Sequence, residues 1–303
     1  MFKKIINKQD YIINPTLSTS DIKDIKVNLF GKEYFMHQDE WMHNVHLKIT
    51  DVCNAKCWFC VEKDSNIKEN KAVFLSNMIS LLDQMLAQNV LSTVTITGGE
   101  PTLCPYLQDI LDILSHYDIF LTMNTNGRCI PDLKNPPQWI NISKHNFNDS
   151  HITGLPNVTL DDLSEIKSKL KTNIRLQSVL QAGELDSVDK ILLFIDCYKD
   201  AVDDFSFRQL ISNLNITNQP LLVPFREYLL KYGSLVEQVF QDYYVYEVWY
   251  LQGIKITLSF SDMVMLTSSE KTEDIRILRE IIIHPDGLIS GDWSRTTKII
   301  KGV

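Results

Sequence analysis

The sequence predicts an α/β protein with a parallel sheet that is either open or curled into a partial barrel. Six strand-like runs follow one another, and helical patterns lie between most of them. This order is typical of parallel strands, because each helix carries the chain back across the sheet. The strand-like runs are 45–50, 94–97, 119–125, 140–145, 174–180 and 204–210, and the helical patterns are 73–86, 106–115, 160–170 and 188–198.

Alternating polar residues along these strands indicate what kind of sheet it is. Strands that are covered on both faces normally read as continuous apolar runs, whereas one parity of these runs is largely polar. The polar sets are Lys48 and Thr50; Thr95 and Thr97; Thr122, Asn124 and Asn126; Asn141, Ser143 and His145; Arg175 and Gln177; Ser206 and Arg208. One polar and one apolar face predict a curled sheet around a ligand cavity. The alternative is that some of these strands are edges or half-exposed.

The segments on either side of this core have other patterns. Residues 1–40 predict an N-terminal hairpin extension with Gly31 at its turn, and the core is expected at 41–214. Residues 215–303 predict a small α+β region that closes or covers the sheet. Its expected elements are a helix at 225–240, a strand at 254–260 and a hairpin of 281–283 with 288–289.

Composition and charge disfavour several classes of protein. The chain has 303 residues and a formal net charge of −8, which argues against a broad phosphate-binding surface and makes nucleic acid an unexpected partner. The first residues, MFKKIINKQDYIINP, lack the apolar core of a signal peptide, and no segment has the length of a membrane span. Six cysteines in a chain of this length do not form a dense disulfide framework. We therefore expect a cytoplasmic protein without a membrane partner.

Three of the cysteines are clustered in the stretch CNAKCWFC, directly after the first predicted strand. Cys53, Cys57 and Cys60 can converge on one metal centre if the backbone loops around it, and soft thiolates suit iron–sulfur clusters or zinc. Three ligands are one too few for a closed four-coordinate zinc site. A zinc site would need a fourth ligand, for which His43 and His46 are the nearest candidates.

Two further motifs end the next two predicted strands. Thr97-Gly98-Gly99-Glu100-Pro101 follows the second strand, and Asn124-Thr125-Asn126-Gly127 ends the third. With CxxxCxxC and the aromatic Phe59 before its last cysteine, these elements resemble the signature of the radical S-adenosylmethionine superfamily. The resemblance covers about residues 45–210, and it is strongest to the branch that contains the molybdenum-cofactor GTP cyclase and peptide-maturing enzymes.

The resemblance implies a fold, cofactors and roles for particular residues. It implies a partial (β/α)6 barrel with one 4Fe-4S cluster, held by Cys53, Cys57 and Cys60, whose fourth iron binds S-adenosylmethionine. The cofactor-binding residues that it implies are Phe59, Gly98, Gly99, Glu100, Pro101, Asn124, Asn126, Ser143, His145 and Gln177. Arg175 and Arg208 are candidates for binding the methionine carboxylate or an anionic substrate. Their alternative role is structural, in ion pairs that hold strand ends.

The remaining cysteines narrow the expected function. Many peptide-modifying relatives bind further clusters through C-terminal cysteines, but this chain has no cysteine after Cys197, so we expect a cluster-free cover region. Ser290, Gly291 and Asp292 stand where such a ligand would be expected. Cys104 and Cys129 are candidate hydrogen donors to a substrate radical, or else buried apolar cysteines. The pattern around Cys197 predicts a core position.

These observations predict a radical S-adenosylmethionine enzyme that forms a 5′-deoxyadenosyl radical and abstracts hydrogen from a peptide or natural-product intermediate. An electron donor such as flavodoxin or ferredoxin is the implied partner. Modification of a nucleotide or another small metabolite is the alternative among enzymes. The contrasting class is a non-catalytic protein that binds zinc or an iron–sulfur cluster and a partner.

Overall fold

The computed structural model describes residues 23–38, 43–60, 62, 65–209, 221–240, 244–261, 277–278, 280–295 and 298–300. Within these ranges the strands form a 12-stranded sheet and a separate 3-stranded sheet. The expected domain boundaries near residues 40 and 214 lie outside the described ranges, so the division of the chain into three parts stays a prediction.

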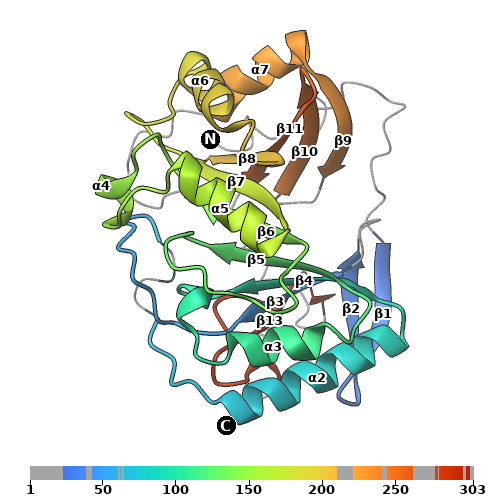
Figure 1. Ribbon diagram of the computed structural model, residues 1–303. Coiled ribbons are helices and arrows are strands. Elements are labelled where there is room, and N and C mark those ends of the chain that lie inside the picture. Colours follow the sequence, from blue (N-terminus) through green and yellow to red (C-terminus); the bar gives the residue numbers. More distant parts are fainter. Residues whose placement is uncertain are drawn as a thin grey trace.

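Six parallel strands in sequence order form the centre of the large sheet, which confirms the α/β class. Each strand pairs in parallel with the next one along the chain. The strands are β3 (His43–Lys48), β4 (Leu91–Thr97), β5 (Phe120–Thr125), β6 (Trp139–Ser143), β7 (Asn173–Leu180) and β8 (Asp204–Gln209). Four connecting helices lie along the outer side of the sheet (Figure 1). They are α2 (Lys71–Ala87), α3 (Leu107–Leu114), α5 (Leu160–Leu170) and α6 (Val188–Tyr198).

Local sequence decides where three of these helices begin. Asn70 caps α2 by accepting a hydrogen bond from the backbone N–H of Val73, and Ser187 caps α6 in the same way. At the start of α5, Thr159 and Asp162 form a reciprocal capping box. Such caps satisfy backbone donors that have no partner within the helix. The cap residues thus fix the ends of the helices that follow β3, β6 and β7.

The strand register places the polar residues on one face of the sheet. Neighbouring strands pair Lys48 with Thr97, Thr95 with Thr122, Asn124 with Asn141, Ser143 with Gln177 and Gln177 with Ser206. Paired residues point to the same side of a sheet, so the polar parity continues across all six strands. The opposite face is apolar and packs on the helices, as the ring contact of Phe194 in α6 with Phe205 in β8 illustrates.

The C-terminal part of the chain adds strands to both edges of this parallel core. At one edge β13 (Ile281–Ile283) pairs in parallel with β3 and continues into β14 (Ile289–Ser290) and β15 (Lys298–Ile300). At the other edge β11 (Ile254–Ser261) pairs in parallel with β8, followed by β10 (Tyr244–Leu251) and β9 (Ser234–Phe240). The region expected to cover the sheet therefore also extends it, and its predicted hairpin at 281–289 is confirmed.

The prediction of one helix over 225–240 is wrong. Helix α7 (Leu222–Tyr232) ends at Gly233, and the following residues form strand β9. The backbone N–H of Gly233 closes the helix by donating to the carbonyl of Leu229 at 2.7 Å. Strand β9 then forms through antiparallel pairing with the next strand, β10, for which the sequence pattern predicted no element. Pairing with this neighbouring strand outweighs the local helical pattern.

The predicted N-terminal hairpin is confirmed. Strands β1 (Lys23–Leu29) and β2 (Lys32–Gln38) pair antiparallel, and both turn residues, Phe30 and Gly31, have positive φ. A short strand, β12 (Ile277–Leu278), joins β2 to complete the small sheet. No helix in the described part of the chain combines the length and apolar character that crossing a membrane requires.

Candidate active site

The cysteine loop, residues 50–60, leaves the carboxyl end of β3. Its three thiols are free, with Cys53 exposed and Cys57 and Cys60 half-buried. Burial raises the pKa of Cys57 to about 11, and the neighbouring thiols Cys60 and Cys53 act in the same direction. The three thiols therefore lie within electrostatic reach of one another. A cluster bound to them as thiolates would have to displace their protons.

The described residues do not form a site for a single metal ion. Among the described residues no group of three His, Cys, Asp or Glu side chains is placed to hold one metal ion. The ring of His46, one of the two candidate fourth ligands for zinc, packs against Trp293 with 5.1 Å between centroids. The side chain of His43 lies outside the described residues. Three thiols on one loop have the soft donor chemistry that suits an iron–sulfur cluster.

The two glycines of the second motif lie directly against the cysteine loop. The backbone N–H of Gly99 donates to the carbonyl of Thr50 at 2.7 Å, and that of Glu100 donates to the carbonyl of Val52 at 2.8 Å. A Cβ on Gly99 would lie 2.4 Å from the Val52 carbonyl oxygen, and one on Gly98 would lie 2.6 Å from the Thr50 oxygen. Glycine is required here because two backbone segments touch, which the sequence did not indicate.

Glu100 links the second motif to the third. Its buried carboxylate accepts from the Thr125 hydroxyl at 2.6 Å and from the Asn126 backbone N–H at 2.7 Å, through different oxygens. The Thr102 hydroxyl and backbone N–H donate to the same oxygen as Thr125. Pro101 opens the short helix η2 (Pro101–Leu103) in which Thr102 lies. Most of the carboxylate's acceptor capacity is thus used within the protein.

Asn126 completes the contact between the three motifs. Its side-chain amide donates to the Asn54 side-chain oxygen at 2.8 Å, and Asn54 lies between the first two cysteines of the loop. On the polar face below, the Asn141 amide donates to Asn124 at 2.9 Å. The ends of β3, β4 and β5 therefore meet in one hydrogen-bonded site.

His145 and Phe59 lie at the end of β6 beside this site. The ring of His145 makes an edge contact with Phe59 at 5.0 Å between centroids. Its Nδ1 accepts from the backbone N–H of Val179 at 3.1 Å, so the neutral ring carries its proton on Nε2. Burial lowers the pKa of His145 to about 4, which keeps the ring neutral. The neighbouring Ser143 pairs with Gln177 at the ends of β6 and β7.

The two predicted arginines differ in their surroundings. Arg175 donates from Nε to the buried carboxylate of Asp204 at 2.7 Å and lies over the Trp139 ring at 5.0 Å. These contacts favour its structural role. Arg208 is exposed, and within the described residues no hydrogen bond or ion pair of its guanidinium is found. Burial raises the pKa of Glu280 and the charge of Arg208 acts in the opposite direction, so Arg208 has an acidic neighbour although no described residue is hydrogen-bonded to it.

The remaining cysteines differ in how exposed they are. Cys104 is buried with its thiol 3.8 Å from the Ile49 carbonyl, among core residues, which favours a packing role over that of a hydrogen donor at the cavity rim. Cys129 is exposed, so the buried alternative does not apply to it. The core prediction for Cys197 is wrong, because its side chain is exposed on α6. A helical pattern alone did not resolve on which side of the apolar stripe Cys197 lies.

Lys48 and Asp51 are site residues whose roles the sequence pattern did not reveal. Lys48 lies on the polar face but is buried, and its Nζ pairs with Asp51 at 2.7 Å and with Glu62. Asp51 also accepts from the Ser65 hydroxyl at 2.7 Å and from the Ile67 backbone N–H at 2.6 Å. These bonds hold both ends of the cysteine loop together. Burial opposes them, but the hydrogen bonds leave the pKa of Asp51 below its ordinary value.

Where a further cluster ligand would be expected, the structure has a polar contact instead. His284 donates from Nε2 to the Ser290 hydroxyl at 2.7 Å, because Ser290 gives its own proton to the Asp292 carbonyl at 2.7 Å. All three residues are buried. Since no cysteine follows Cys197, thiolates for a second cluster are absent from this part of the sequence.

Comparison with known proteins finds a family match over the part of the chain that contains the three motifs. Residues 47–171 match the family model of the Radical SAM superfamily. A probable GTP 3′,8-cyclase from Thermococcus kodakarensis is 25% identical over 155 residues, which are 47% of this chain and 50% of the relative. The GTP 3′,8-cyclase of Lactiplantibacillus plantarum is 30% identical over 171 residues, 52% of this chain and 50% of the relative. The chain thus spans about half the length of the curated relatives it matches.

A solved structure matches more of the chain. Streptococcus suis SuiB bound to S-adenosylmethionine has a TM-score of 0.60 at 15% identity, covering 86% of this chain and 62% of that chain. A likeness at this identity establishes the fold only. The fold and the three joined motifs agree with the family match, which makes residues 47–171 of this α/β protein a Radical SAM domain.

Proposed function

We propose that this chain is a radical SAM enzyme in which Cys53, Cys57 and Cys60 hold one 4Fe-4S cluster and S-adenosylmethionine binds at the carboxyl edge of the sheet. The observation that carries the proposal is the joining of the three motifs. Glu100 bonds Asn126, Asn126 bonds Asn54, and Gly99 bonds Thr50. Groups from three strands are thereby fixed around one place before any ligand binds.

The chain's own residues have distinct tasks in this proposal. The carbonyls of Gly98 and Gly99 would accept hydrogen bonds from the amino group of S-adenosylmethionine, while Glu100 holds the Asn126 turn and has little acceptor capacity left. Neutral His145 can donate from Nε2 towards the ribose or the carboxylate. When bound, the cluster and S-adenosylmethionine supply a 5′-deoxyadenosyl radical that abstracts hydrogen from a substrate.

The charges on the concave polar face bear on the substrate class. Lys48 is paired with Asp51 and Glu62, and Arg175 is paired with Asp204. The strand register places the cations Lys48, Arg175 and Arg208 on this face. Of these, only Arg208 has no acidic partner in ion-pair contact among the described residues. A nucleoside triphosphate needs several uncommitted cations. These charges therefore support a peptide or natural-product intermediate over a nucleotide.

The relatives point to both substrate classes. The curated relatives are named GTP 3′,8-cyclases, and they match this chain over the radical SAM half. SuiB, which has been solved with the precursor peptide SuiA, covers 88% of this chain with a TM-score of 0.58 at 14% identity. That likeness is one of fold and does not transfer a substrate. Nucleotide modification accordingly remains the second candidate, favoured by the names of the curated relatives.

Anaerobic reconstitution tests the proposed activity. The protein should bind about four irons, as the cluster stoichiometry requires, and release 5′-deoxyadenosine from S-adenosylmethionine with dithionite. Flavodoxin or ferredoxin would be tried next as the electron donor. Cys57→Ala should abolish cleavage, whereas Cys197→Ala, at an exposed position on α6, should retain it. A protein that holds one zinc ion and forms no 5′-deoxyadenosine would be the non-catalytic alternative.

Substrate class can be tested in the same assay. Arg208→Ala separates the two roles expected of Arg208, because loss of the basal formation of 5′-deoxyadenosine would assign it to the methionine carboxylate, and unchanged basal formation would leave it for an anionic substrate. Candidate peptides and GTP are then compared by how far each stimulates 5′-deoxyadenosine formation in the unmodified protein. Stimulation by GTP, lost in Arg208→Ala, would replace the peptide proposal by the nucleotide one.

A further inference from the structure

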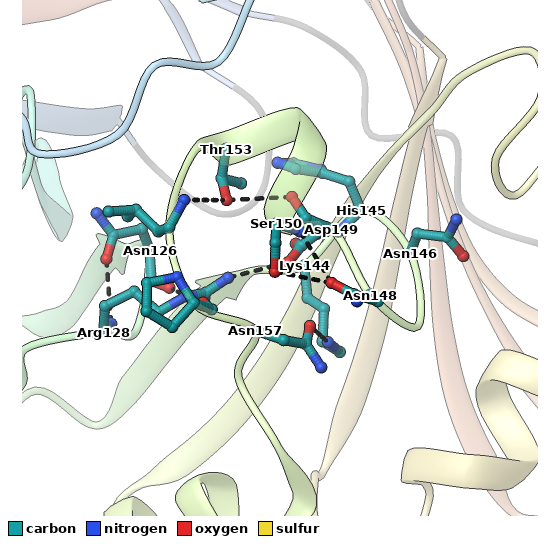
Figure 2. A network of polar contacts seen from close by, with 12 residues as sticks. Asn126, Arg128, Lys144, His145, Asn146, Asn148, Asp149, Ser150, Thr153 and Asn157 are labelled. Carbon is teal, nitrogen blue, oxygen red and sulfur yellow. Dashed lines mark hydrogen bonds and ion pairs between the residues drawn. The ribbon is translucent and has the colours of Figure 1, made fainter.

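Asp149, in the connection after β6, is buried, and its two carboxylate oxygens and its backbone carbonyl all accept hydrogen bonds. One carboxylate oxygen accepts from an Arg128 guanidinium nitrogen at 2.9 Å, and the other accepts from the backbone N–H of His145 at 3.0 Å. Its backbone carbonyl accepts from the Thr153 hydroxyl at 3.1 Å. Figure 2 shows these contacts converging on Asp149. None of these bonds belongs to a regular helix or strand ladder, so they hold the loop itself.

Arg128 connects Asp149 to the third motif. It comes two residues after Asn126 and donates to the Asn126 backbone carbonyl at 2.6 Å as well as to Asp149. The Asn126 side chain donates in turn to Asn54, between Cys53 and Cys57 (Figure 2 shows Asn126 and Arg128). The Arg128 side chain is 6% exposed and that of Asp149 is 0% exposed, so the pair is removed from solvent.

Thr153 connects Asp149 to the same part of the cysteine loop from the other side. Thr153 ends the short helix α4 (Ser150–Thr153), and its carbonyl accepts from the backbone N–H of Lys56 at 2.7 Å. The next residue, Gly154, lies so near that a Cβ there would be 3.6 Å from the Lys56 Cβ. Hydrogen bonds therefore hold the cysteine loop at Lys56 as well as at Asn54.

The contacts form a closed ring that begins and ends between the first two cysteines. It runs from Asn54 through Asn126, Arg128, Asp149 and Thr153 to Lys56. A side branch from Asp149 through His145 reaches Phe59, between the second and third cysteines. Within the described residues two contacts of Arg128 join the halves of the ring, namely the pair with Asp149 and a hydrogen bond from Nε to the Pro156 carbonyl.

We propose that Arg128 and Asp149 are positioning residues that hold residues 54–56 in place and thereby set the relative positions of Cys53 and Cys57. The inference rests on the proposed function for its consequence at a cluster, but the positioning itself is a property of the chain. The pair also carries opposite buried charges beside the loop. Removing either charge changes the net charge in a place that water does not reach.

The sign of this change in charge predicts the direction in which the reduction potential of a bound cluster shifts. Adding an electron to a cluster is favoured by a nearby positive charge and disfavoured by a negative one. Asp149→Asn removes the negative charge beside Arg128, which also acts on the buried Lys144. Arg128→Gln removes one of the positive charges near Asp149, and that of Lys144 remains. The two variants should therefore shift the reduction potential of a bound cluster in opposite directions, upward and downward, and the double variant should lie near the unmodified protein.

A matched control exists elsewhere in the fold. Arg226 on α7 and Glu247 on β10 form another buried pair, with Nε to Oε1 at 3.0 Å and side chains 8% and 0% exposed. Glu247→Gln disturbs an Arg–carboxylate pair of the same kind, away from the cysteine loop. It should lower the melting temperature comparably while leaving the cluster properties unchanged. Arg128→Lys keeps the charge but loses the fork that reaches both Asn126 and Asp149.

The first measurement needs no cluster. Hydrogen exchange in the metal-free chain reports the Lys56 amide, which is bonded to Thr153. We expect exchange at Lys56 to accelerate at least tenfold in Asp149→Asn and in Arg128→Lys, and to stay unchanged in Glu247→Gln. Equal protection of Lys56 in all variants would overturn the positioning role. This result stands even if the unmodified protein binds no iron, in which case only the proposed function fails.

The second measurement uses the reconstituted protein. A redox titration followed by electron paramagnetic resonance gives the potential, and loss of iron to EDTA gives the lability of the site. We expect opposite shifts for Asp149→Asn and Arg128→Gln, an unshifted potential in Arg128→Lys, and iron loss several-fold faster in all three. Shifts of the same sign in the first two, or equally fast iron loss in Glu247→Gln, would contradict the proposal. If Asp149→Asn fails to fold, the variants Arg128→Gln and Arg128→Lys still test the proposal.

Discussion

Glu100 accepts a hydrogen bond from the backbone N–H of Asn126 at 2.7 Å, across the gap between the ends of β4 and β5. The bond joins two motifs that lie 26 residues apart in the sequence. It explains why a carboxylate stands after the glycines, because a buried anion with several donors around it fixes the turn that follows β5. The same turn then reaches the cysteine loop through Asn54.

Glu100→Gln should destabilise the protein and loosen the site. The amide nitrogen that replaces one oxygen faces a donor, either Thr125 or Asn126, so at least one buried hydrogen bond is lost. Losing a charge-assisted buried bond costs about 2–3 kcal/mol. Urea unfolding measures this free energy, with Glu227→Gln at an exposed position of α7 as the control. A loss below about 0.5 kcal/mol, the range of ordinary surface substitutions, would show that the Glu100 bonds are unimportant.

Gly99→Ala should disrupt the cysteine loop more severely. The added Cβ would lie 2.4 Å from the carbonyl oxygen of Val52 and 2.6 Å from that of Asp51, and neither backbone atom can move without the loop. We expect a loss of about 3 kcal/mol, at the upper end of overpacking, together with loss of iron binding on reconstitution. Thermal unfolding and iron analysis check both.

Gly183→Ala is the comparison for the glycine variant. Gly183 has φ of +86° but no atom within 4 Å of an added Cβ, so only backbone strain of about 1 kcal/mol applies. It should keep full iron binding. If Gly99→Ala behaved like Gly183→Ala in both measurements, the close approach of the two loops would not be the reason for glycine at this position.

The stability of the protein should fall in mild acid, in part through His284. Burial, with Arg295 and Lys48 nearby, lowers the pKa of His284 to about 4 from an ordinary 6.5. Its contribution is complete above the unfolded value and is lost as the pH falls towards 4, because the unfolded chain then takes up a proton that the folded chain refuses. This linkage amounts to about 2 kcal/mol between pH 7 and pH 5.

Urea unfolding at the two pH values tests this linkage. His284→Gln cannot take up the proton, so its loss of stability between pH 7 and pH 5 should be smaller than that of the unmodified protein. Some acid sensitivity should persist, because burial also lowers the pKa of His145 to about 4. An identical pH dependence in the variant would mean that His284 is not the group responsible.

Cys104→Ala should affect folding rather than chemistry. The thiol is buried beside the Ile49 carbonyl among core residues, so its removal leaves a small cavity costing about 1 kcal/mol. The yield of 5′-deoxyadenosine, and of product once a substrate is known, should stay unchanged. Cys129→Ala, at an exposed position, should leave the stability as it is. Loss of product with retained 5′-deoxyadenosine in Cys104→Ala would restore its role as hydrogen donor.

The sequence alone determined the parallel core and the place of the site. Strand and helix periodicities, the polar parity and the three motifs are local patterns, and short-range rules connect them to elements and strand ends. The register of β3 to β8 follows that parity, and the three motifs meet where the strand order places them. The α/β class and the cysteine loop therefore needed no tertiary information.

Only the tertiary structure decided which residues bond to which. The strands added to the parallel core at both edges of the sheet and the pairing of Arg175 with Asp204 depend on partners far along the chain, and strand β9 within the expected helix depends on pairing with the next strand, β10. The reason for Gly99 and the role of Asp149 are likewise invisible until separate loops touch. Local propensity fixes the pieces, but contacts between distant segments are selected by packing and buried hydrogen bonding of the whole chain, which no short window of sequence contains.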